Sequence, residues 1–264
     1  MLKAQDLRIT FNPGTPIENK ALRGMSLAIP EGEFVSVIGS NGAGKSTFLN
    51  AVAGDLSVDS GNIWVNGIDV THQSTWQRAG QVARVFQDPM AGTCEALSIE
   101  ENMALAMARG QPRGLRRAID RQIREVFRER LSILKLGLEN RLSDRIGLLS
   151  GGQRQAISLL MASLQPSSIL LLDEHTAALD PKTAAFVLEL TDRIVKQGHL
   201  TTLMVTHSMR QALDYGMRTV MLHQGQVVLD VSGEQRARMT VSDLLAMFER
   251  TRGEEIADDS LLLD

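Results

Sequence analysis

Hydrophobic and polar residues form two kinds of pattern along the chain. Short apolar runs predict β-strands at residues 7–11, 26–29, 34–38, 61–65, 82–86, 169–172, 201–206, 219–223 and 226–230. Helical patterns occupy about 46–53, 116–136, 181–196 and 209–215. Because strands and helices alternate over much of the chain, the pattern predicts an α/β fold with a parallel core sheet.

The middle of the chain, from about residue 98 to 164, has a mostly helical pattern. Ser98 and Glu101 fit a capping box, which would begin one helix. In the segment 116–136, apolar side chains recur near the helical period of about 3.6 residues. We therefore expect a block of helices inserted into the α/β core.

One uncharged stretch, residues 155–172, approaches the length of a membrane-spanning helix. Pro166 interrupts it, and glutamine and serine side chains dilute it, so we interpret it as a buried helix, a turn and a buried strand. Residues 1–6 contain no apolar signal region. We expect no transmembrane helix, so any role at a membrane would depend on a partner protein.

Composition narrows the classes of function. The chain has 264 residues, of which 43% are apolar, enough to bury the core of one large domain or two lobes. A formal net charge of -3 gives no overall basic field, so we do not expect nucleic acid as a partner. The single Cys94 excludes an internal disulfide and suits a reducing compartment. Residues 253–264 carry five acidic and no basic side chains, which predicts a loosely ordered tail.

The strongest chemical pattern follows the strand at 34–38. There the chain fits G-x-x-x-x-G-K-[ST] with Gly39, Ser40, Asn41, Gly42, Ala43, Gly44, Lys45, Ser46 and Thr47. A strand, a glycine-rich turn and a helix in this order direct backbone N–H groups into one concavity, which suits phosphate oxygens. Lys45 would add a positive charge near the outer phosphates, and the Ser46 hydroxyl could ligate Mg²⁺. The alternative is a glycine-rich turn with an incidental lysine.

Two carboxylates, Asp173 and Glu174, end the apolar run at 169–172. In phosphate-loop proteins we expect such a strand to lie beside the loop-bearing strand, so that Asp173 reaches the Mg²⁺ shell. Glu174, one residue on, would point elsewhere and polarise a water for attack on the γ-phosphate. Alone, a strand that ends in two acids is common; the phosphate loop is what makes this pair informative.

A second glycine-containing run lies about a hundred residues beyond the phosphate loop. Ser150, Gly151, Gly152 and Gln153 follow Leu149 at the start of a helical pattern, and a helix N-terminus of this kind forms an anion site. The whole constellation resembles the ATP-binding cassette (ABC) ATPases, whose five-residue signature motif appears here without substitution. The resemblance implies a head-to-tail dimer of two copies, with each ATP held between the loop of one subunit and the signature of the other.

The resemblance assigns four further residues. Gln87 matches the glutamine loop, whose side chain contacts Mg²⁺ and the attacking water, and Asp180 matches the loop that touches the opposite active site. His207, at a strand end, matches the switch histidine near the γ-phosphate. Phe11 stands where the family places an aromatic that stacks on adenine, although an aromatic that ends a strand is often a core residue. The remaining histidines have no motif and receive no role: His72, His175, His199 and His223.

The resemblance covers roughly residues 3–230 and implies the fold. The family has a phosphate-loop (RecA-like) α/β core, an N-terminal antiparallel β subdomain and an inserted α-helical subdomain. We expect the ATPase domain at 1–232, with the helical subdomain at about 91–164, and a short C-terminal helix and acidic tail at 233–264. The implied cofactors are ATP and Mg²⁺.

The chain departs from the family pattern without losing a catalytic group. His175 stands where many members have proline or alanine, and Ala156 and Met161 stand where many have arginine. These departures indicate a subfamily. The combination is similar to ATPase subunits of bacterial importers that work with a separate binding protein and a permease like those for branched-chain amino acids.

The implied function is ATP hydrolysis on behalf of separate transmembrane permease subunits, with Glu174, His207, Lys45 and Gln87 as catalytic residues. The chain would lie at the cytoplasmic face of the inner membrane, attached through the permease, and would act on a solute-binding protein only indirectly. We expect import of a small solute such as an amino acid. The alternatives are the ATPase subunit of an exporter and a soluble ABC ATPase in cofactor assembly.

A basic segment, residues 109–130, holds eight arginines against Asp120, Glu125 and Glu129. One interpretation is a solvated helical face. The other is contact with lipid headgroups or a permease loop, which salt would weaken.

Overall fold

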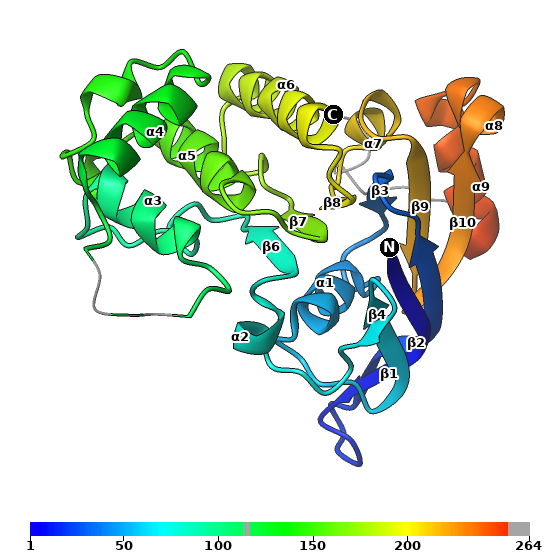
Figure 1. Ribbon diagram of the computed structural model, residues 1–264. Helices are drawn as coiled ribbons and strands as arrows, with labels where there is room; N and C mark the ends of the chain where they lie inside the picture. Colours follow the sequence, from blue (N-terminus) through cyan, green and yellow to red (C-terminus); the bar gives the residue numbers. More distant parts are fainter. Residues whose placement is uncertain (113, 115–116, 253–264) are drawn as a thin grey trace.

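The computed structural model describes residues 1–112, 114 and 117–252, and its larger sheet has six strands (Figure 1). Their order is β10–β9–β3–β8–β7–β6. The bounds are Phe34–Ile38 for β3, Val82–Val85 for β6, Ile169–Asp173 for β7, Thr202–Val205 for β8, Arg218–His223 for β9 and Gln226–Ser232 for β10. All neighbours pair in parallel except β10, which is antiparallel to β9. The predicted parallel core is confirmed.

The strand order corrects one expectation. Strand β7, which ends in Asp173, does not lie beside β3, because β8 pairs with both of them. The apolar runs of β7 and β8 are alike in length and burial, so the sequence could not tell which one adjoins β3. Since all three strands are parallel, their carboxyl ends still lie at one edge of the sheet, and Asp173 is one strand away from the phosphate loop.

The smaller sheet is antiparallel and has the order β2–β1–β4–β5. Its strands are Leu2–Phe11 (β1), Asn19–Ile29 (β2), Ser60–Val65 (β4) and Ile68–Asp69 (β5). In β1 and β2 buried and exposed residues roughly alternate, as expected for a sheet with one face on the core. This sheet confirms the N-terminal antiparallel β subdomain.

A block of helices connects β6 to β7, at the upper left of Figure 1. It contains α3 (Ile99–Met107), α4 (Arg121–Ser132), α5 (Gly151–Ser163) and the 3-10 turns Leu138–Asn140 and Ile146–Leu148. Helix α3 starts with the predicted capping box, in which the Glu101 N–H donates to Ser98 Oγ at 3.2 Å and the Ser98 N–H donates to the Glu101 carboxylate at 2.7 Å. The inserted helical subdomain of the family fold is therefore present.

Helix α4 begins at Arg121 rather than at the predicted residue 116. Asp120 is the N-cap, and its carboxylate accepts a hydrogen bond from the Ile123 N–H at 2.8 Å. A side-chain cap of this kind fixes a helix start more firmly than the apolar period does.

The arginines of segment 109–130 are partly engaged within the helical block. Arg109 is turned inward and donates to the carbonyls of Ala162 and Gln165 near the end of α5, both at 3.2 Å. Arg124 pairs with Glu100 at 2.7 Å and Arg128 with Glu125. Arg113 and Arg116 lie outside the described residues. The local charge excess available to a partner is therefore smaller than the sequence alone indicates.

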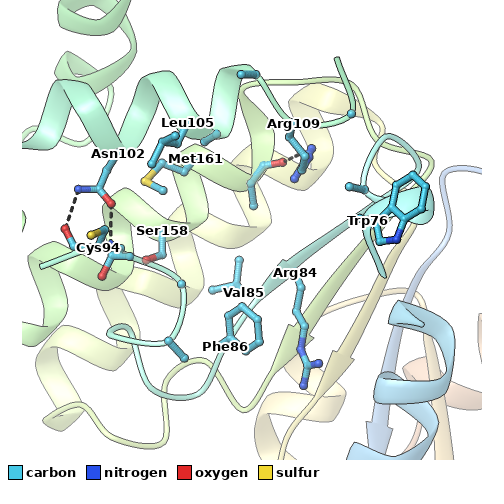
Figure 2. Close-up of a pocket in the computed structure, with 18 of the residues that line it drawn as sticks. Trp76, Arg84, Val85, Phe86, Cys94, Asn102, Leu105, Arg109, Ser158 and Met161 are labelled. Carbon is cyan, nitrogen blue, oxygen red and sulfur yellow. Dashed lines mark hydrogen bonds between the residues drawn. The ribbon is translucent and has the colours of Figure 1, made fainter. Parts of the chain in front are cut away.

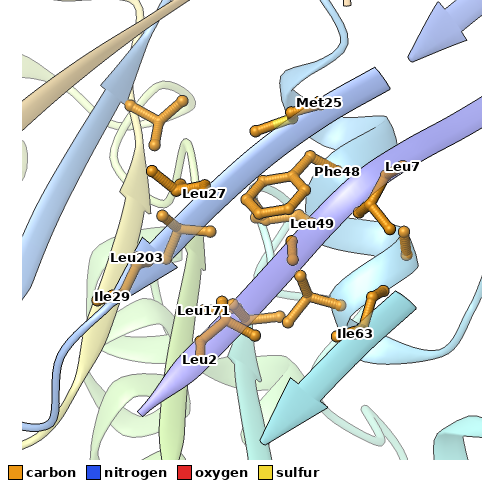
Figure 3. Close-up of a cluster of buried hydrophobic side chains, with 14 of the residues drawn as sticks. Leu2, Leu7, Met25, Leu27, Ile29, Phe48, Leu49, Ile63, Leu171 and Leu203 are labelled. Atoms are coloured by element: carbon orange, nitrogen blue, oxygen red, sulfur yellow. The ribbon is translucent and has the colours of Figure 1, made fainter. Parts of the chain in front are cut away.

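Helix α1 (Lys45–Ala53) lies between the two sheets and joins them through one apolar core (Figure 3). Phe48 and Leu49 are fully buried, with Leu2 of the small sheet and Leu171 of the large sheet in the same cluster. Burying each such side chain contributes about 1.5–3 kcal/mol. The phosphate loop, which leads into α1, is thus anchored to a core that both sheets share.

The remaining helices are α2 (Thr75–Arg78), α6 (Pro181–Gly198), α7 (Met209–Asp214), α8 (Gly233–Ala237) and α9 (Val241–Arg252). The C-terminal part has two helices where one was expected, and Leu244 and Phe248 of α9 are buried against Ile38 and Met209 of the core. The boundary at residue 232 stays a prediction. The acidic tail at 253–264 lies outside the described residues.

No helix within the described ranges has the length and hydrophobicity required to cross a bilayer. The uncharged stretch at 155–172 is divided between α5 and β7, as predicted.

Candidate active site

Two glycines shape the phosphate loop. A Cβ atom on Gly39, at φ 149°, would lie 2.3 Å from the Leu222 carbonyl oxygen of β9. A Cβ on Gly44, the N-cap of α1 at φ 100°, would lie 2.7 Å from the Ala21 carbonyl oxygen of β2. Both contacts are closer than any side chain permits, so the loop can pack against β9 and β2 only because these residues are glycine.

Lys45 is folded back over the loop. Its ammonium group donates to the carbonyls of Gly39 at 2.7 Å and Ser40 at 3.2 Å, and the residue is only 5% exposed. Burial lowers the pKa of Lys45, while the negative charges of Glu174 and Asp173 act in the opposite direction. The positive charge therefore lies inside the loop and close to both carboxylates.

A cavity of about 240 Å³ lies against the phosphate loop. Its lining brings together Phe11, the loop residues Asn41, Gly42, Ala43, Gly44, Lys45, Ser46 and Thr47, and the distant Gln87, Glu174 and His207. Asn19 and Ala21, which sequence reasoning did not single out, also line it. Phe11 keeps 36% of its surface exposed, so it is not a core residue. Residues from six separate parts of the sequence thus meet where the motifs predicted a nucleotide.

Glu174 and His207 contact each other directly. Glu174 Oε1 lies 2.6 Å from His207 Nε2, and both side chains are largely buried. Glu174 has φ 45°, a left-handed conformation that is costly for a residue with a side chain, and its N–H donates to the Val205 carbonyl at 3.0 Å. Strain of this kind, about 1–3 kcal/mol, is concentrated at functional sites. The left-handed conformation of Glu174 ends the extended backbone of β7 at Asp173.

Asp173 is paired with a residue that sequence reasoning missed. Arg84 of β6 donates to Asp173 Oδ2 at 2.6 Å and to Asp55 Oδ2 at 2.8 Å. The signal was present in the sequence, because a charged residue within the apolar run of β6 has to be paired if the strand is buried.

The signature residues lie away from this cavity. Ser150 is the N-cap of α5: its hydroxyl accepts from the Gln153 N–H at 3.3 Å, and its own N–H donates to Gln153 Oε1 at 3.2 Å. Gly151 follows at the first position of the helix, and a Cβ on Gly152 would lie 2.1 Å from Cγ2 of Thr183 in α6. None of these four residues lines the cavity at the phosphate loop.

Asp180, the N-cap of α6, is also absent from the cavity lining. Hydrogen bonds from the side chain and N–H of Thr183 lower the pKa of its carboxyl group. The phosphate loop and the helix starts of α5 and α6 therefore form two separate regions of one chain.

His175 is a second residue to which the sequence gave no role. Its side chain is buried, and its Nε2 lies 2.9 Å from Thr191 Oγ1 of α6. Because the Thr191 hydroxyl donates to the Val187 carbonyl, it accepts from His175, which places the proton of the imidazole on Nε2. Burial lowers the pKa of His175 to about 4, so the ring is neutral near pH 7.

A larger groove of about 1170 Å³ runs between α2, the end of β6 with the following loop, α3 and α5 (Figure 2). Trp76 of α2 and Leu105 of α3 are 76% and 50% exposed along it. The Gln155 side chain of α5 donates to the Phe86 carbonyl at 3.0 Å, directly before Gln87. Phe86 lines the groove, and the next residue, Gln87, lines the cavity at the phosphate loop, so the groove and the cavity meet at neighbouring residues.

The fold and the site together define an ATP-hydrolysing cassette. Its features are a parallel core sheet, a phosphate loop, a paired acid and histidine, and a separate signature helix. The chain belongs to the ABC transporter family, whose pattern it matches over residues 22–177. ATP binding and hydrolysis follow from this membership.

Comparison with individual proteins supports the same class. The chain is 45% identical over 251 residues to a tyrosine transport ATP-binding protein of Clostridioides difficile (strain R20291), covering 94% of this chain and 99% of the relative. It is 34% identical over 228 residues to the energy-coupling factor transporter ATP-binding protein EcfA2 of Acetivibrio thermocellus, covering 86% and 78%. Among solved structures, the dimeric post-hydrolysis state of the ATP-binding cassette MJ0796 with ADP and Pi has a TM-score of 0.75 at 29% identity, covering 88% of this chain and 98% of that one.

Proposed function

We propose that this ATPase energises the import of an amino acid, and that tyrosine or a related aromatic amino acid is the cargo. The observation that carries the proposal is the 45% identity to a tyrosine transport ATP-binding protein over nearly the full length of both chains. A phosphonate import ATP-binding protein at 34% identity favours import more broadly. The residues that select the cargo lie on other polypeptides, so the proposal rests on the likeness of the cassette as a whole.

The residues that line the cavity, together with the nearby Asp173, supply the groups that hydrolysis needs. Lys45 offsets the charge of the outer phosphates, and Phe11 stacks on the adenine. The Ser46 hydroxyl, the Gln87 amide oxygen and the Asp173 carboxylate are oxygen donors, which fit Mg²⁺. When bound, Mg²⁺ would neutralise charge that develops on the phosphates.

Glu174 acts as the general base in this proposal. Its carboxylate accepts a proton from the attacking water, and His207 Nε2, at 2.6 Å from Glu174 Oε1, orients that carboxylate and reaches toward the γ-phosphate. Glu174 pairs with His207 and Asp173 pairs with Arg84, so the two adjacent carboxylates can take different roles.

A head-to-tail dimer completes each site. The signature residues do not reach the cavity of their own chain, and their helix start is capped and exposed at Ser150. A second copy turned by a two-fold axis would bring Ser150, Gly151, Gly152 and Gln153, together with Asp180, to the γ-phosphate side of the cavity. The similar cassette MJ0796 is dimeric in its post-hydrolysis state with ADP and Pi, which supports this arrangement.

The groove behind Gln87 suits a membrane partner. It is lined mainly by apolar or small side chains, and the indole of Trp76 is exposed along it. We assign it to a short segment of a permease subunit, which would hold the chain at the cytoplasmic face of the membrane and take up the motion of the helical block. A permease of the branched-chain amino acid type, working with a solute-binding protein, stays our prediction for that partner.

Transport by the reconstituted complex tests the proposal. The tagged chain is purified with the membrane subunits that accompany it and is placed in proteoliposomes, with ATP on the side of the cassette and the solute-binding protein on the other. We expect ATP-dependent uptake of tyrosine in preference to leucine, and no uptake with the Glu174→Gln variant. Preference for leucine would contradict the aromatic cargo, movement in the opposite direction would indicate an exporter, and absence of any membrane partner would favour cofactor assembly.

A further inference from the structure

Arg84 is the charged residue of an otherwise apolar strand and takes no part in the roles assigned above. It lies in β6 between buried Ala83 and Val85, opposite Leu171 of β7, and its side chain is only 13% exposed. A guanidinium group in such a place is costly unless its charge is paired.

Three contacts hold the guanidinium. Nη2 donates to Asp173 Oδ2 at 2.6 Å and Nη1 donates to Asp55 Oδ2 at 2.8 Å, while the buried Nε makes no hydrogen bond within the described residues. The guanidinium carbon lies 4.6 Å from the centre of the Phe86 ring, and Figure 2 shows these two side chains. Asp55 is itself fixed, because the Thr75 hydroxyl of α2 donates to its other oxygen at 2.7 Å. Asp173 is therefore tied, through Arg84 and Asp55, to the helix that carries Trp76 on the wall of the groove.

Asp173 is held by one oxygen only. Oδ2 accepts from Arg84, and within the described part of the chain no other side-chain hydrogen bond involves Asp173. Its side chain is 13% exposed, and its charge acts on Lys45 inside the phosphate loop. A carboxylate that is anchored through one oxygen presents the other in a fixed direction, which is how partners of metal ligands orient them.

We propose that Arg84 is a positioning residue that fixes the Asp173 carboxylate so that Oδ1 meets the magnesium shell of the bound nucleotide; the inference rests on the proposed role of Asp173. Arg84 is well suited to this task because its planar, forked donors hold two carboxylates at a set angle. A lysine carries the same charge, but a single ammonium group cannot reproduce that angle.

The test is Arg84→Lys, which keeps the charge and removes the fork. Affinity for a non-hydrolysable ATP analogue is measured by equilibrium titration with excess Mg²⁺ and again with EDTA, and the ratio of the two affinities is the magnesium increment. In EDTA we expect Arg84→Lys to bind the analogue with the affinity of the wild type. With Mg²⁺ we expect its magnesium increment to be about tenfold smaller, since residues that position metal ligands typically contribute 10- to 100-fold to metal affinity.

Arg218→Lys is the matched control. Arg218 of β9 also bridges two carboxylates, Asp230 at 2.5 Å and Glu33 at 3.1 Å, and its side chain is 16% exposed. Neither of these carboxylates acts on Lys45 of the phosphate loop, whereas that of Asp173 does. The Arg218→Lys variant should have a lower melting temperature than the wild type but the same magnesium increment. Loss of the increment in both lysine variants would show general destabilisation and overturn the proposal.

Asp173→Asn separates the inference from the function it rests on. If Asp173→Asn loses the increment and folded Arg84→Lys keeps it, Arg84 only strengthens the sheet and the inference fails alone. If Asp173→Asn keeps the increment, the magnesium role of Asp173 fails and the inference fails with it. Should Arg84→Lys not fold, Asp55→Asn loosens the second anchor of the same guanidinium, and an unchanged increment there overturns the proposal.

Discussion

Replacing His175 by glutamine should flatten the dependence of stability on pH. In the folded protein burial lowers the pKa of His175 to about 4, whereas an exposed histidine has a pKa of 6.5. The folded state therefore resists protonation, and the stability that the neutral ring contributes is fully present above about pH 6.5 and is lost as the pH falls toward 4. The difference between the two pKa values corresponds to a loss of about 3 kcal/mol in the free energy of unfolding over the whole titration, of which about 2 kcal/mol falls between pH 8 and pH 5.

The measurement is the free energy of unfolding in urea, without nucleotide, at a series of pH values from about 8 to 5. Glutamine keeps an N–H that can donate to Thr191, but it does not titrate, so the wild type should lose about 2 kcal/mol more than the variant over this range. The carboxyl groups with lowered pKa, such as Asp180, are common to both proteins and cancel in the difference. His72→Gln, which removes an exposed histidine, should retain the wild-type dependence. Parallel curves for wild type and His175→Gln would refute the buried, neutral histidine.

Three further predictions concern the cavity. Lys45→Ala should greatly weaken ATP binding in a nucleotide titration, because it removes the buried charge that faces the outer phosphates; unchanged affinity would contradict the phosphate-loop assignment. Phe11→Ala should cost about 1 kcal/mol of ATP affinity through lost base stacking, and an unchanged Kd would leave Phe11 without that role. Gly39→Ala should abolish nucleotide binding, since its Cβ would lie 2.3 Å from the Leu222 carbonyl oxygen. Gly42→Ala has open space around its Cβ and should cost about 1–2 kcal/mol in stability from its positive φ alone. Equal effects of the two variants in thermal melts and nucleotide titrations would contradict the close-packing argument.

The motif residues were predictable because each belongs to a local pattern. A strand, a glycine turn and a lysine at fixed spacing determine where the Lys45 ammonium lies, and the structure places it inside the loop. Glu174 and His207 each end a parallel strand, and the carboxyl ends of such strands meet at one edge of the sheet.

What the sequence could not provide depends on contacts between distant segments. The position of β8 between β3 and β7 follows from pairing, which similar apolar runs do not reveal. The ion pair of Arg84 with Asp173 joins residues 89 positions apart, and only the unusual charge within β6 hinted at it. The short helix α8 was missed because none of its five residues is buried, so it has no apolar pattern. The apolar residues of α9, by contrast, recur at the helical period: Val241, Leu244, Leu245 and Phe248.

The account depends above all on a composite site between two copies of the chain. Glu174→Gln keeps the size of the side chain but removes the base, so with ATP and Mg²⁺ the variant should bind nucleotide, close the head-to-tail dimer and nearly cease hydrolysis. Size-exclusion chromatography of Glu174→Gln with ATP and Mg²⁺ should therefore show a dimer, and adding Ser150→Arg should return it to a monomer because the opposite signature no longer fits the γ-phosphate. A Glu174→Gln variant that hydrolyses ATP at the wild-type rate, or a dimer that survives Ser150→Arg, would contradict the account.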